Sequence, residues 1–255
     1  MAKAPSHDQE QVPEKGERIA KVMARAGLCS RREAERWIAD GRVVVDGTKL
    51  TSPALTVTPA NTVVVDGKPL AGNEETKVWR YHKPAGLIVS HSDPDGRTTI
   101  FERLPKDLPR VISVGRLDLN SEGLMLLTNN GELARHMEKP DTGWIRRYRV
   151  RVNGRVDETA LAKLANGVTI SGVRYGAIKA EMDMQKGANA WLTMALTEGK
   201  NREIRKVMEH MGYRVTRLIR TAYGPFQLGN MARGAVTDVS RKMLRESVPN
   251  SFKLD

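Results

Sequence analysis

The sequence predicts an α+β protein with a small N-terminal module and a larger module after it. Two short amphipathic helical patterns come first, and two similar valine-rich runs that each meet an Asp-Gly pair follow them. From residue 78 onward, separated strand patterns alternate with loops and with one amphipathic helix. A chain of 255 residues with 40% hydrophobic residues is long enough to bury a sizeable core.

The first helix is expected over residues 18–26. Four apolar residues recur there at the spacing of one helix face: Ile19, Val22, Met23 and Ala26. Gly27 ends the pattern, because glycine favours the position just past a helix. Lys21 and Arg25 lie off the apolar face.

A second helix is expected to begin at Ser30, because Glu33 follows three residues later in a capping-box pattern. Its apolar side is formed by Ala34, Trp37 and Ile38. Three basic residues lie in or near its first turns: Arg31, Arg32 and Arg36. Positive charge at a helix N-terminus costs about 0.3–1 kcal/mol per exposed residue. This cost indicates a role for the arginines other than helix stability.

Two similar segments follow, at residues 43–50 and 63–70. Each is a run of three valines that meets an Asp-Gly pair, which is the pattern of a β-hairpin. The polar stretch 71–77 is the expected boundary between modules. Residues 1–16, rich in Pro, Gln, Glu and Lys, are expected to form a disordered tail.

The segment 115–124 places one acidic residue, Asp118, in a glycine-bounded turn between two apolar strand patterns. A loop on a rigid scaffold can present such a carboxylate to a reactant. The competing interpretation is a turn aspartate that bonds its own backbone. Spacing alone favours this structural interpretation.

Two further segments carry candidate site residues. Alternation over 147–152 puts Tyr148 on the packed face of a strand and three arginines on the other face. By pattern alone, Tyr148 is a core tyrosine.

The turn at 198–201 leads into a helix whose apolar stripe consists of Ile204, Val207, Met208 and Met211. Arg202 and Lys206 are expected to project away from that stripe, and Arg205 lies at its margin. From the margin, Arg205 could reach inward or could pair with Glu209 on the surface.

Four separated motifs, taken in order, resemble the pseudouridine synthases of ribosomal RNA, in the group formed by synthase A of the small subunit and synthase B of the large subunit. They are Lys83-Pro84, the 115–124 segment, Tyr148 and the 198–205 segment. The resemblance spans about residues 17–245 and implies that Asp118 is the catalytic residue. It also implies that Tyr148 stacks on the target base and that Arg205 pairs with Asp118.

The helix–helix–strand pattern over 17–70 resembles the S4 RNA-binding domain. Together the two resemblances imply an S4 domain followed by a catalytic domain at 78–247, built on a larger mixed, mainly antiparallel sheet, with a tail at 248–255. They imply a set of RNA-contacting cations: Arg25, Arg31, Arg32, Arg36, Lys83, Arg116, Lys200, Arg202 and Lys206. For Lys83, an exposed turn lysine is the competing interpretation. Arg214, Arg217 and Arg220 are expected to contact phosphates.

Composition agrees with a nucleic-acid partner, because a net charge of +12 favours a polyanion. A single cysteine, Cys29, excludes an internal disulfide and fits a reducing, cytoplasmic compartment. No segment approaches the roughly 20 apolar residues of a membrane span. The five histidines show no zinc-type spacing, and no nucleotide-binding glycine motif is present, so we expect neither metal nor cofactor.

The S4 pattern and the basic 202–206 and 217–220 runs resemble the large-subunit type most closely. This implies 23S RNA as substrate, and the expected partner is ribosomal RNA or a ribosomal subunit during assembly. A small-subunit 16S RNA enzyme is the alternative within the family. A second alternative is a non-catalytic S4-type ribosome-assembly protein, in which Asp118 would be a structural turn residue. A glycoside hydrolase would pair Asp118 with Glu122, but only 5% aromatic residues disfavour a sugar cleft. We expect a monomer.

Overall fold

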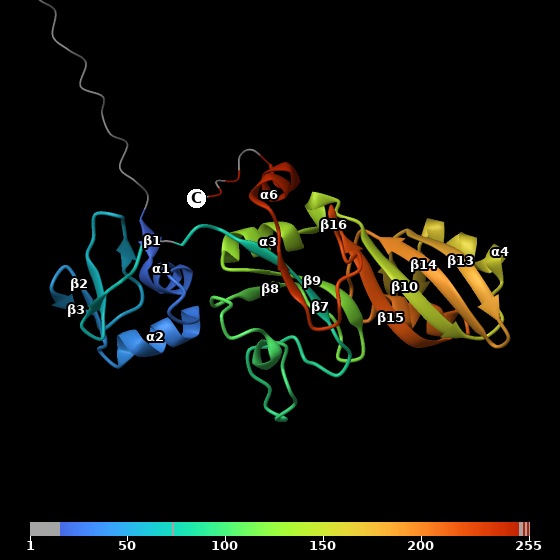
Figure 1. Ribbon diagram of the computed structural model, residues 1–255, viewed down its shortest axis with the longest axis horizontal. Coiled ribbons are helices and arrows are strands. Elements are labelled where there is room, and N and C mark those ends of the chain that lie inside the picture. Colours follow the sequence, from blue (N-terminus) through green and yellow to red (C-terminus); the bar gives the residue numbers. More distant parts are fainter. Residues whose placement is uncertain (1–15, 73, 250–251, 253, 255) are drawn as a thin grey trace, which may run out of the picture. The chain divides into compact units, whose positions relative to one another are not determined.

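The computed structural model describes residues 16–72, 74–249, 252 and 254. The chain divides into two compact units, residues 1–74 and 75–255, and each is described by itself (Figure 1). The tail predicted over residues 1–16 lies outside the described residues, except for Gly16.

The first unit packs two helices and short antiparallel strands around one core. Its elements are β1 (Glu17–Arg18), α1 (Ile19–Arg25), α2 (Arg31–Ala39), β2 (Val43–Val45), β3 (Thr48–Lys49), β4 (Thr56–Val57), β5 (Val63–Val65) and β6 (Lys68–Pro69). The four-stranded sheet has the order β3-β2-β5-β6, and β1 pairs with β4. Ile19, Met23 and Ile38 are fully buried in this core.

Local signals in the sequence account for these elements. The predicted capping box is confirmed, because the Ser30 hydroxyl accepts from the Glu33 amide at 3.1 Å and the Glu33 carboxylate accepts from the Ser30 amide at 2.7 Å. Both predicted hairpins form, β2–β3 and β5–β6. The two valine runs pair antiparallel, with Val43 opposite Val65, so the repeated segments lie side by side.

The second unit is built on a nine-stranded sheet with the main order β13-β14-β10-β15-β9-β7-β17. Its strands are β7 (Val78–Lys83), β8 (Ile112–Val114), β9 (Glu122–Thr128), β10 (Arg146–Asn153), β13 (Ile178–Lys186), β14 (Asn189–Leu196), β15 (Arg214–Tyr223), β16 (Phe226–Gln227) and β17 (Val236–Asp238). β11 (Val168–Ile170) and β12 (Val173–Tyr175) form a separate hairpin. Of the pairs in the large sheet, β9 and β15 run parallel and the others antiparallel. The predicted mixed, mainly antiparallel sheet is confirmed.

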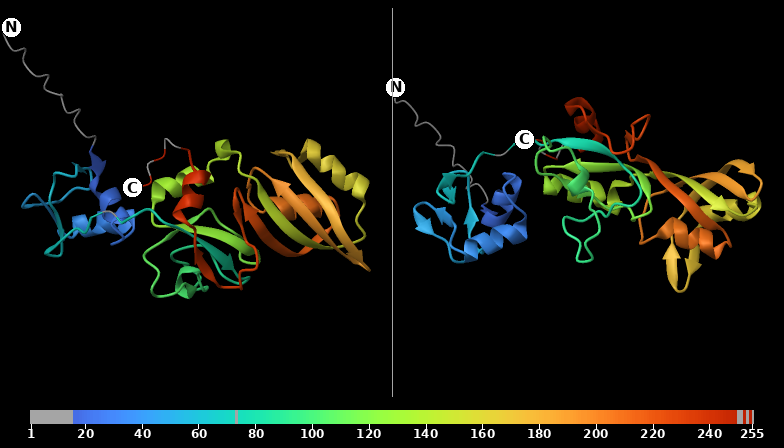
Figure 2. Two further views of the ribbon diagram at one scale, coloured as in Figure 1. Left: turned by 45° about the horizontal axis from the view of Figure 1, so that its top comes forward. Right: turned by 60° about the horizontal axis from the view of Figure 1, so that its bottom comes forward.

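Helices cover both faces of this sheet. They are α3 (Gly131–Glu138), α4 (Glu158–Ala162), α5 (Glu203–His210) and α6 (Arg241–Ser247), with 3-10 turns η1 (Phe101–Arg103), η2 (Pro140–Thr142) and η3 (Lys163–Asn166). One core joins α4 and α5 to the Tyr148 face, and a second core joins α3 and α6 to the other face. In the right view of Figure 2, α5 (orange) and α6 (red) lie on opposite sides of the sheet. Val248, expected to begin a tail, is buried in the second core.

The contact between β9 and β15 depends on Gly123. Its φ of +106° is in a region that favours glycine, and an added Cβ would lie 2.3 Å from the Arg220 carbonyl oxygen. The two backbones can therefore approach only because no side chain is present at this position.

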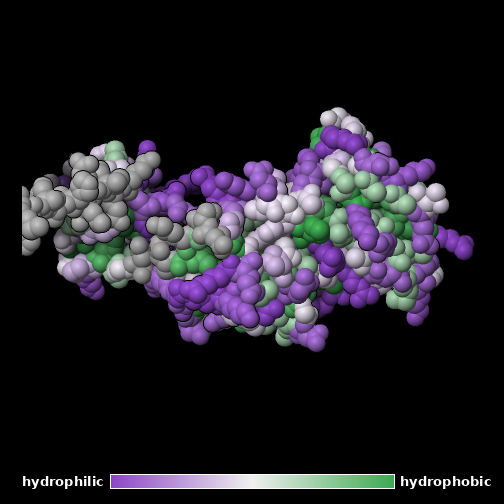
Figure 3. Space-filling model, turned by 90° about the horizontal axis from the view of Figure 1, so that it is seen from above, coloured by the Kyte–Doolittle hydropathy of each residue, from purple (hydrophilic) through white to green (hydrophobic). Residues whose placement is uncertain are grey.

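The surface is mainly hydrophilic, and Figure 3 shows hydrophobic residues as separate green patches among purple ones. Large exposed hydrophobic side chains are scattered over the described residues: Leu28, Leu55, Leu119, Ile145, Val173 and Met184. Within the described part of the chain, no helix has the length and apolar character to cross a membrane.

Candidate active site

A cavity of about 810 Å³ opens in the second unit, where the ends of β8, β10 and β14 meet the turn before α5. Five of the predicted site residues line it: Arg116, Asp118, Tyr148, Lys200 and Arg202. These residues come from three separated stretches of sequence. The fold therefore brings together the motifs that the sequence presented one by one.

The Asp118 carboxylate is the acidic group at the centre of this arrangement, with 29% of its side chain exposed. Its Oδ2 atom lies 3.7 Å from Arg205 Nε and 3.7 Å from Arg202 Nη1. Arg205 is held in place because it donates to the carbonyls of Asn120 at 3.1 Å and Val215 at 3.5 Å. Positive charge is thus fixed on one side of the carboxylate, while its remaining surface faces the cavity.

Arg202, expected to project away from the apolar stripe of α5, lies beside Asp118. Arg202 precedes α5 and adopts a left-handed backbone conformation with φ of +53°. The helical angle used for the prediction does not apply at such a residue. This backbone turn directs the guanidinium toward Asp118, so Arg202 shares the carboxylate with Arg205.

Lys83 contradicts its predicted role as an RNA contact, because its side chain is fully buried. Its Nζ donates to four backbone carbonyls: Pro84 at 3.0 Å, Asp118 at 3.2 Å, Leu119 at 3.2 Å and Ser121 at 2.9 Å. Three of these belong to the loop that carries Asp118. Lys83 therefore holds the backbone of this loop from behind.

Burial lowers the pKa of Lys83 to about 8, while the negative charges of Asp118 and Glu122 act in the opposite direction. The loop is also fixed by its own backbone. The Ser121 amide donates to the Asp118 carbonyl at 3.0 Å, and the Gly86 amide donates to the Leu119 carbonyl at 2.8 Å. The position of the carboxylate is thus set by a network of bonds around the loop.

Tyr148 lies on the packed face of β10, where buried and exposed residues alternate as predicted. Its side chain packs in the core next to α5, and part of it lines the cavity. Tyr148 is therefore a core tyrosine, as its pattern predicted, and its remaining surface faces the cavity.

Glu122 does not fill the role that a glycoside hydrolase would require. Arg217 binds its carboxylate through two hydrogen bonds, of 2.8 and 3.0 Å, and Arg233 lies 3.4 Å away. The hydrogen bond from Arg217 lowers the pKa of Glu122 below its usual value. Glu122 does not line the cavity. A paired carboxylate outside the cavity cannot act as the second catalytic acid beside Asp118.

Two neighbouring glutamates, Glu198 and Glu203, lie in the cavity wall. Glu203 is buried at the start of α5, accepts from the Lys200 amide at 2.8 Å and lies close to Glu198, which accepts from the Gly176 amide at 2.5 Å. Burial, with the nearby charge of Glu198, raises the pKa of Glu203 to about 7. Glu203 therefore keeps a proton in the folded protein at a pH where an exposed glutamate has lost it.

This pair predicts a pH-dependent stability. Between its ordinary pKa of 4.5 and about 7, folded Glu203 holds a proton that the unfolded chain has released, so the free energy of unfolding falls as pH rises through this window. In Glu203→Gln we expect this fall to be reduced. Thermal unfolding of both proteins at pH 5 and pH 8 measures the difference. Glu209→Gln, on the exposed side of the same helix, should behave as the wild type; equal pH slopes for wild type and Glu203→Gln would contradict the prediction.

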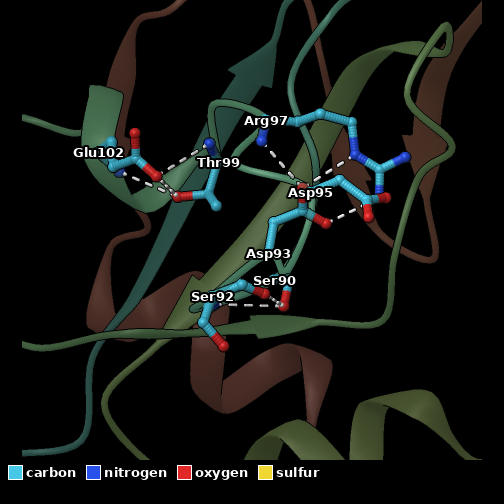
Figure 4. Close-up of polar contacts among 7 residues, drawn as sticks. All are labelled: Ser90, Ser92, Asp93, Asp95, Arg97, Thr99 and Glu102. Carbon is cyan, nitrogen blue, oxygen red and sulfur yellow. Dashed lines mark hydrogen bonds and ion pairs between the residues drawn. The ribbon is translucent and has the colours of Figure 1, made fainter.

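The predicted loop over 86–97 borders the cavity through Ile88 and Val89. Its outer part is tied together internally, as Figure 4 shows. Arg97 donates to both Asp93 oxygens, at 2.9 and 2.7 Å, and also lies 2.7 Å from Asp95. These bonds lower the pKa of Asp93 to about 2. Arg97 is thus engaged within its own loop.

The remaining predicted cations differ in their availability. Lys200 pairs with Glu198, whereas Lys206 is exposed on α5. In the first unit, Arg25 pairs with Glu17, so it is less available to RNA than expected. Three exposed arginines of α2 keep their predicted role as candidate contacts: Arg31, Arg32 and Arg36.

The sequence analysis missed Arg146 as a site residue. This arginine lies two residues before Tyr148 on β10 and lines the same cavity. Arg220, expected to contact phosphates, is buried in the same wall with Tyr223. Extending the predicted strand alternation by one residue would have placed Arg146 on the Tyr148 face.

Among the described residues, no group of three or more His, Cys, Asp or Glu side chains is placed to hold a metal ion.

Comparison with known proteins follows the same division of the chain. The family model described as RNA pseudouridylate synthase matches residues 77–210, and the S4 domain model matches residues 17–69. The chain belongs to the RNA pseudouridylate synthase family. It is an RNA-modifying isomerase that carries an S4 domain, as the sequence motifs predicted.

Relatives extend this match along most of the chain. A protein of Rickettsia felis named "Uncharacterized RNA pseudouridine synthase" is 44% identical over 230 residues, covering 90% of this chain and 100% of that protein. The "Ribosomal large subunit pseudouridine synthase B" of Salmonella typhi is 41% identical and covers 88% of this chain and 79% of that protein. A solved structure titled "Crystal structure of pseudouridylate synthase" has the same fold, with a TM-score of 0.63, 22% identity, and coverage of 91% and 99% of the two chains.

Proposed function

We propose that this pseudouridine synthase isomerises a specific uridine of large-subunit ribosomal RNA, with Asp118 as the catalytic residue. The carrying observation is the Asp118 carboxylate, which faces the cavity with Arg202 and Arg205 each 3.7 Å behind it. The large-subunit substrate is supported by the name of the Salmonella typhi relative. We place the reaction in the cytoplasm and expect the enzyme to act as a monomer on ribosomal RNA or on a ribosomal subunit during assembly.

The reaction needs no external reagent. The bond between ribose C1′ and uracil N1 breaks, the uracil turns, and C5 bonds to the same C1′. The C5 hydrogen leaves as a proton, and N1 gains one, so the atoms balance. Asp118 serves either as nucleophile at the sugar or as base toward it, and both roles require the carboxylate to lie beside the ribose.

The target nucleotide has to leave its stack, because a stacked base cannot present its glycosidic bond to a residue inside a cavity. Tyr148 provides an aromatic surface for the extruded uracil. Such stacking contributes about 1–3 kcal/mol per base. Arg116, two residues before Asp118, is exposed at the cavity, where it can contact the RNA around the vacated position.

Substitution of Tyr148 tests the stacking role. Tyr148→Leu should lower kcat/KM by about 10–100-fold, since the aromatic surface is lost. Tyr148→Phe should stay within about threefold of wild type if the ring is the contributing group. Single-turnover assays on an RNA hairpin provide the rates, and melting temperatures check that both variants fold. An inactive Phe variant with normal stability would assign the role to the hydroxyl instead.

Pseudouridine mapping of total ribosomal RNA tests the function itself. Cells lacking the gene are compared with cells complemented by wild type or by Asp118→Asn. We expect one uridine in 23S RNA to lose its modification and only wild type to restore it. A change in 16S RNA would instead make the small-subunit RNA the substrate. If no site changed, a non-catalytic role in ribosome assembly would be the better explanation.

A further inference from the structure

The wall of the cavity contains two arginines buried against one aromatic ring. Arg146 is 8% exposed and Arg220 is 4% exposed. Their guanidinium carbons lie 4.9 and 5.0 Å from the centre of the Tyr223 ring. Arg146 Nη2 also donates to the Tyr223 hydroxyl at 3.3 Å. Two cations are thus held together on one side chain.

Uncharged backbone carbonyls accept hydrogen bonds from some of the N–H groups of these two arginines. Arg220 Nε donates to the Leu124 carbonyl at 2.8 Å, but its Nη2 is buried and has no acceptor among the described residues. Arg146 Nη1 donates to the carbonyls of Trp144, at 3.2 Å, and Thr197. The fold therefore fixes both side chains and leaves donor capacity unused.

The charge of the pair is not balanced. In the described part of the chain, no carboxylate oxygen lies within 4.0 Å of Arg146 or Arg220, although Glu138 lines the same cavity. By contrast, Arg202 and Arg205 have a carboxylate partner at Asp118, and Arg217 has one at Glu122. Burying two guanidinium groups without an anion is unfavourable, so the site is suited to receive one.

The register of the sheet places this pair beside the base-stacking tyrosine. Arg146 lies two residues before Tyr148 on the same face of β10, which is about 7 Å along the strand. Arg220 is the residue of β15 directly opposite Tyr148. A ligand whose base stacks on Tyr148 would bring the group attached to its ribose toward the two arginines.

We propose that Arg146 and Arg220 form a subsite for a backbone phosphate flanking the reacting uridine. This inference rests on the proposed function. A phosphate matches the planar donor fork of arginine and supplies the missing negative charge. Bound there, it anchors the ribose, so that the glycosidic bond is held against Asp118 while the base turns on Tyr148.

Neutralising single phosphates of the RNA tests the subsite without altering the protein. Hairpins carrying the mapped uridine are prepared with a methylphosphonate linkage on its 5′ side, on its 3′ side or far away in the stem. The ribose preceding each such linkage carries a 2′-O-methyl group, and matched hairpins carry the same group beside a normal phosphate. With wild type, we expect one flanking linkage to lower kcat/KM by about 10–100-fold. The distant linkage should have little effect.

Two protein variants assign the effect to the arginines. Arg146→Lys and Arg220→Lys keep the positive charge but lose the planar donor fork of arginine. Each variant should therefore react more slowly with the normal hairpin. Introducing the flanking methylphosphonate should then lower its kcat/KM by less than about threefold further. Arg147→Lys, on the outward face of the same strand, is the matched control and should behave as wild type.

Each outcome is decisive. A wild-type enzyme indifferent to both flanking methylphosphonates would overturn the subsite, even if the arginine variants fail to fold. Folded arginine variants that retain the full methylphosphonate effect would place the phosphate elsewhere. Failure of the proposed function itself looks different, since wild type would then form no pseudouridine in the unmodified hairpin.

Discussion

Asp118→Asn is expected to lower the rate of pseudouridine formation by at least about 10⁴-fold while RNA affinity stays within about threefold of wild type. The amide has nearly the same shape as the carboxylate, but it can neither attack the sugar nor accept a proton from it. The surrounding loop should keep its structure, because it is held through its backbone carbonyls and not through the Asp118 side chain.

The measurement uses RNA labelled with tritium at C5 of uridine, because formation of the new carbon–carbon bond releases that hydrogen to water. Binding is measured separately by filter retention of the same RNA. Asp107→Asn, an exposed aspartate on a loop, is the matched control and should keep full activity. If the Asp118 variant formed product at a rate near that of wild type, catalysis would have to be assigned to another group.

Lys83→Met is expected to destabilise the second unit strongly. The methionine fills a similar volume but removes the ammonium that bonds four backbone carbonyls, of which that of Ser121 is buried. Breaking a buried charged network costs about 3–5 kcal/mol. In a unit of this size, that corresponds to a fall in melting temperature of roughly 10 °C.

Activity of Lys83→Met should fall as well, by about 100-fold, since a displaced loop misplaces the carboxylate. The rate is measured below the melting temperature of the variant, so that loss of fold and loss of geometry are separated. Lys77→Met, an exposed lysine just before the same strand, is the control and should change neither quantity. A Lys83 variant with normal stability and normal rate would refute the idea that this ammonium holds the catalytic loop.

Sequence patterns predicted the features that depend on neighbours along the chain. The capping box at Ser30, the two Asp-Gly hairpins and the alternation around Tyr148 are local, so their signals lie within a few residues. The burial of Lys83 was not predictable in this way. Its four acceptors come mainly from a loop about 35 residues away, and their convergence exists only after β7 and β9 pair.

Side-chain positions in the site were hardest to predict where the backbone is irregular. A helical wheel assumes regular geometry, but the left-handed backbone at Arg202 turns its side chain toward Asp118. The same wheel succeeded for Arg205, which lies within α5 and reaches inward from the margin of the apolar stripe. Arg146 was missed for a different reason, since its charge is atypical of a packed strand face, although the alternation continues through it.

The place of β15 in the sheet has a consequence for how the protein folds during synthesis. β15 lies between β10 and β9, yet it follows both of them by more than 60 residues. The two halves of the sheet therefore leave the ribosome before the strand that joins them, each with an open edge. Closing those edges depends on contacts between distant parts of the chain, which form slowly. The nascent enzyme is thus most exposed to aggregation while β15 is still being made, and truncation before residue 214 would make that exposure permanent.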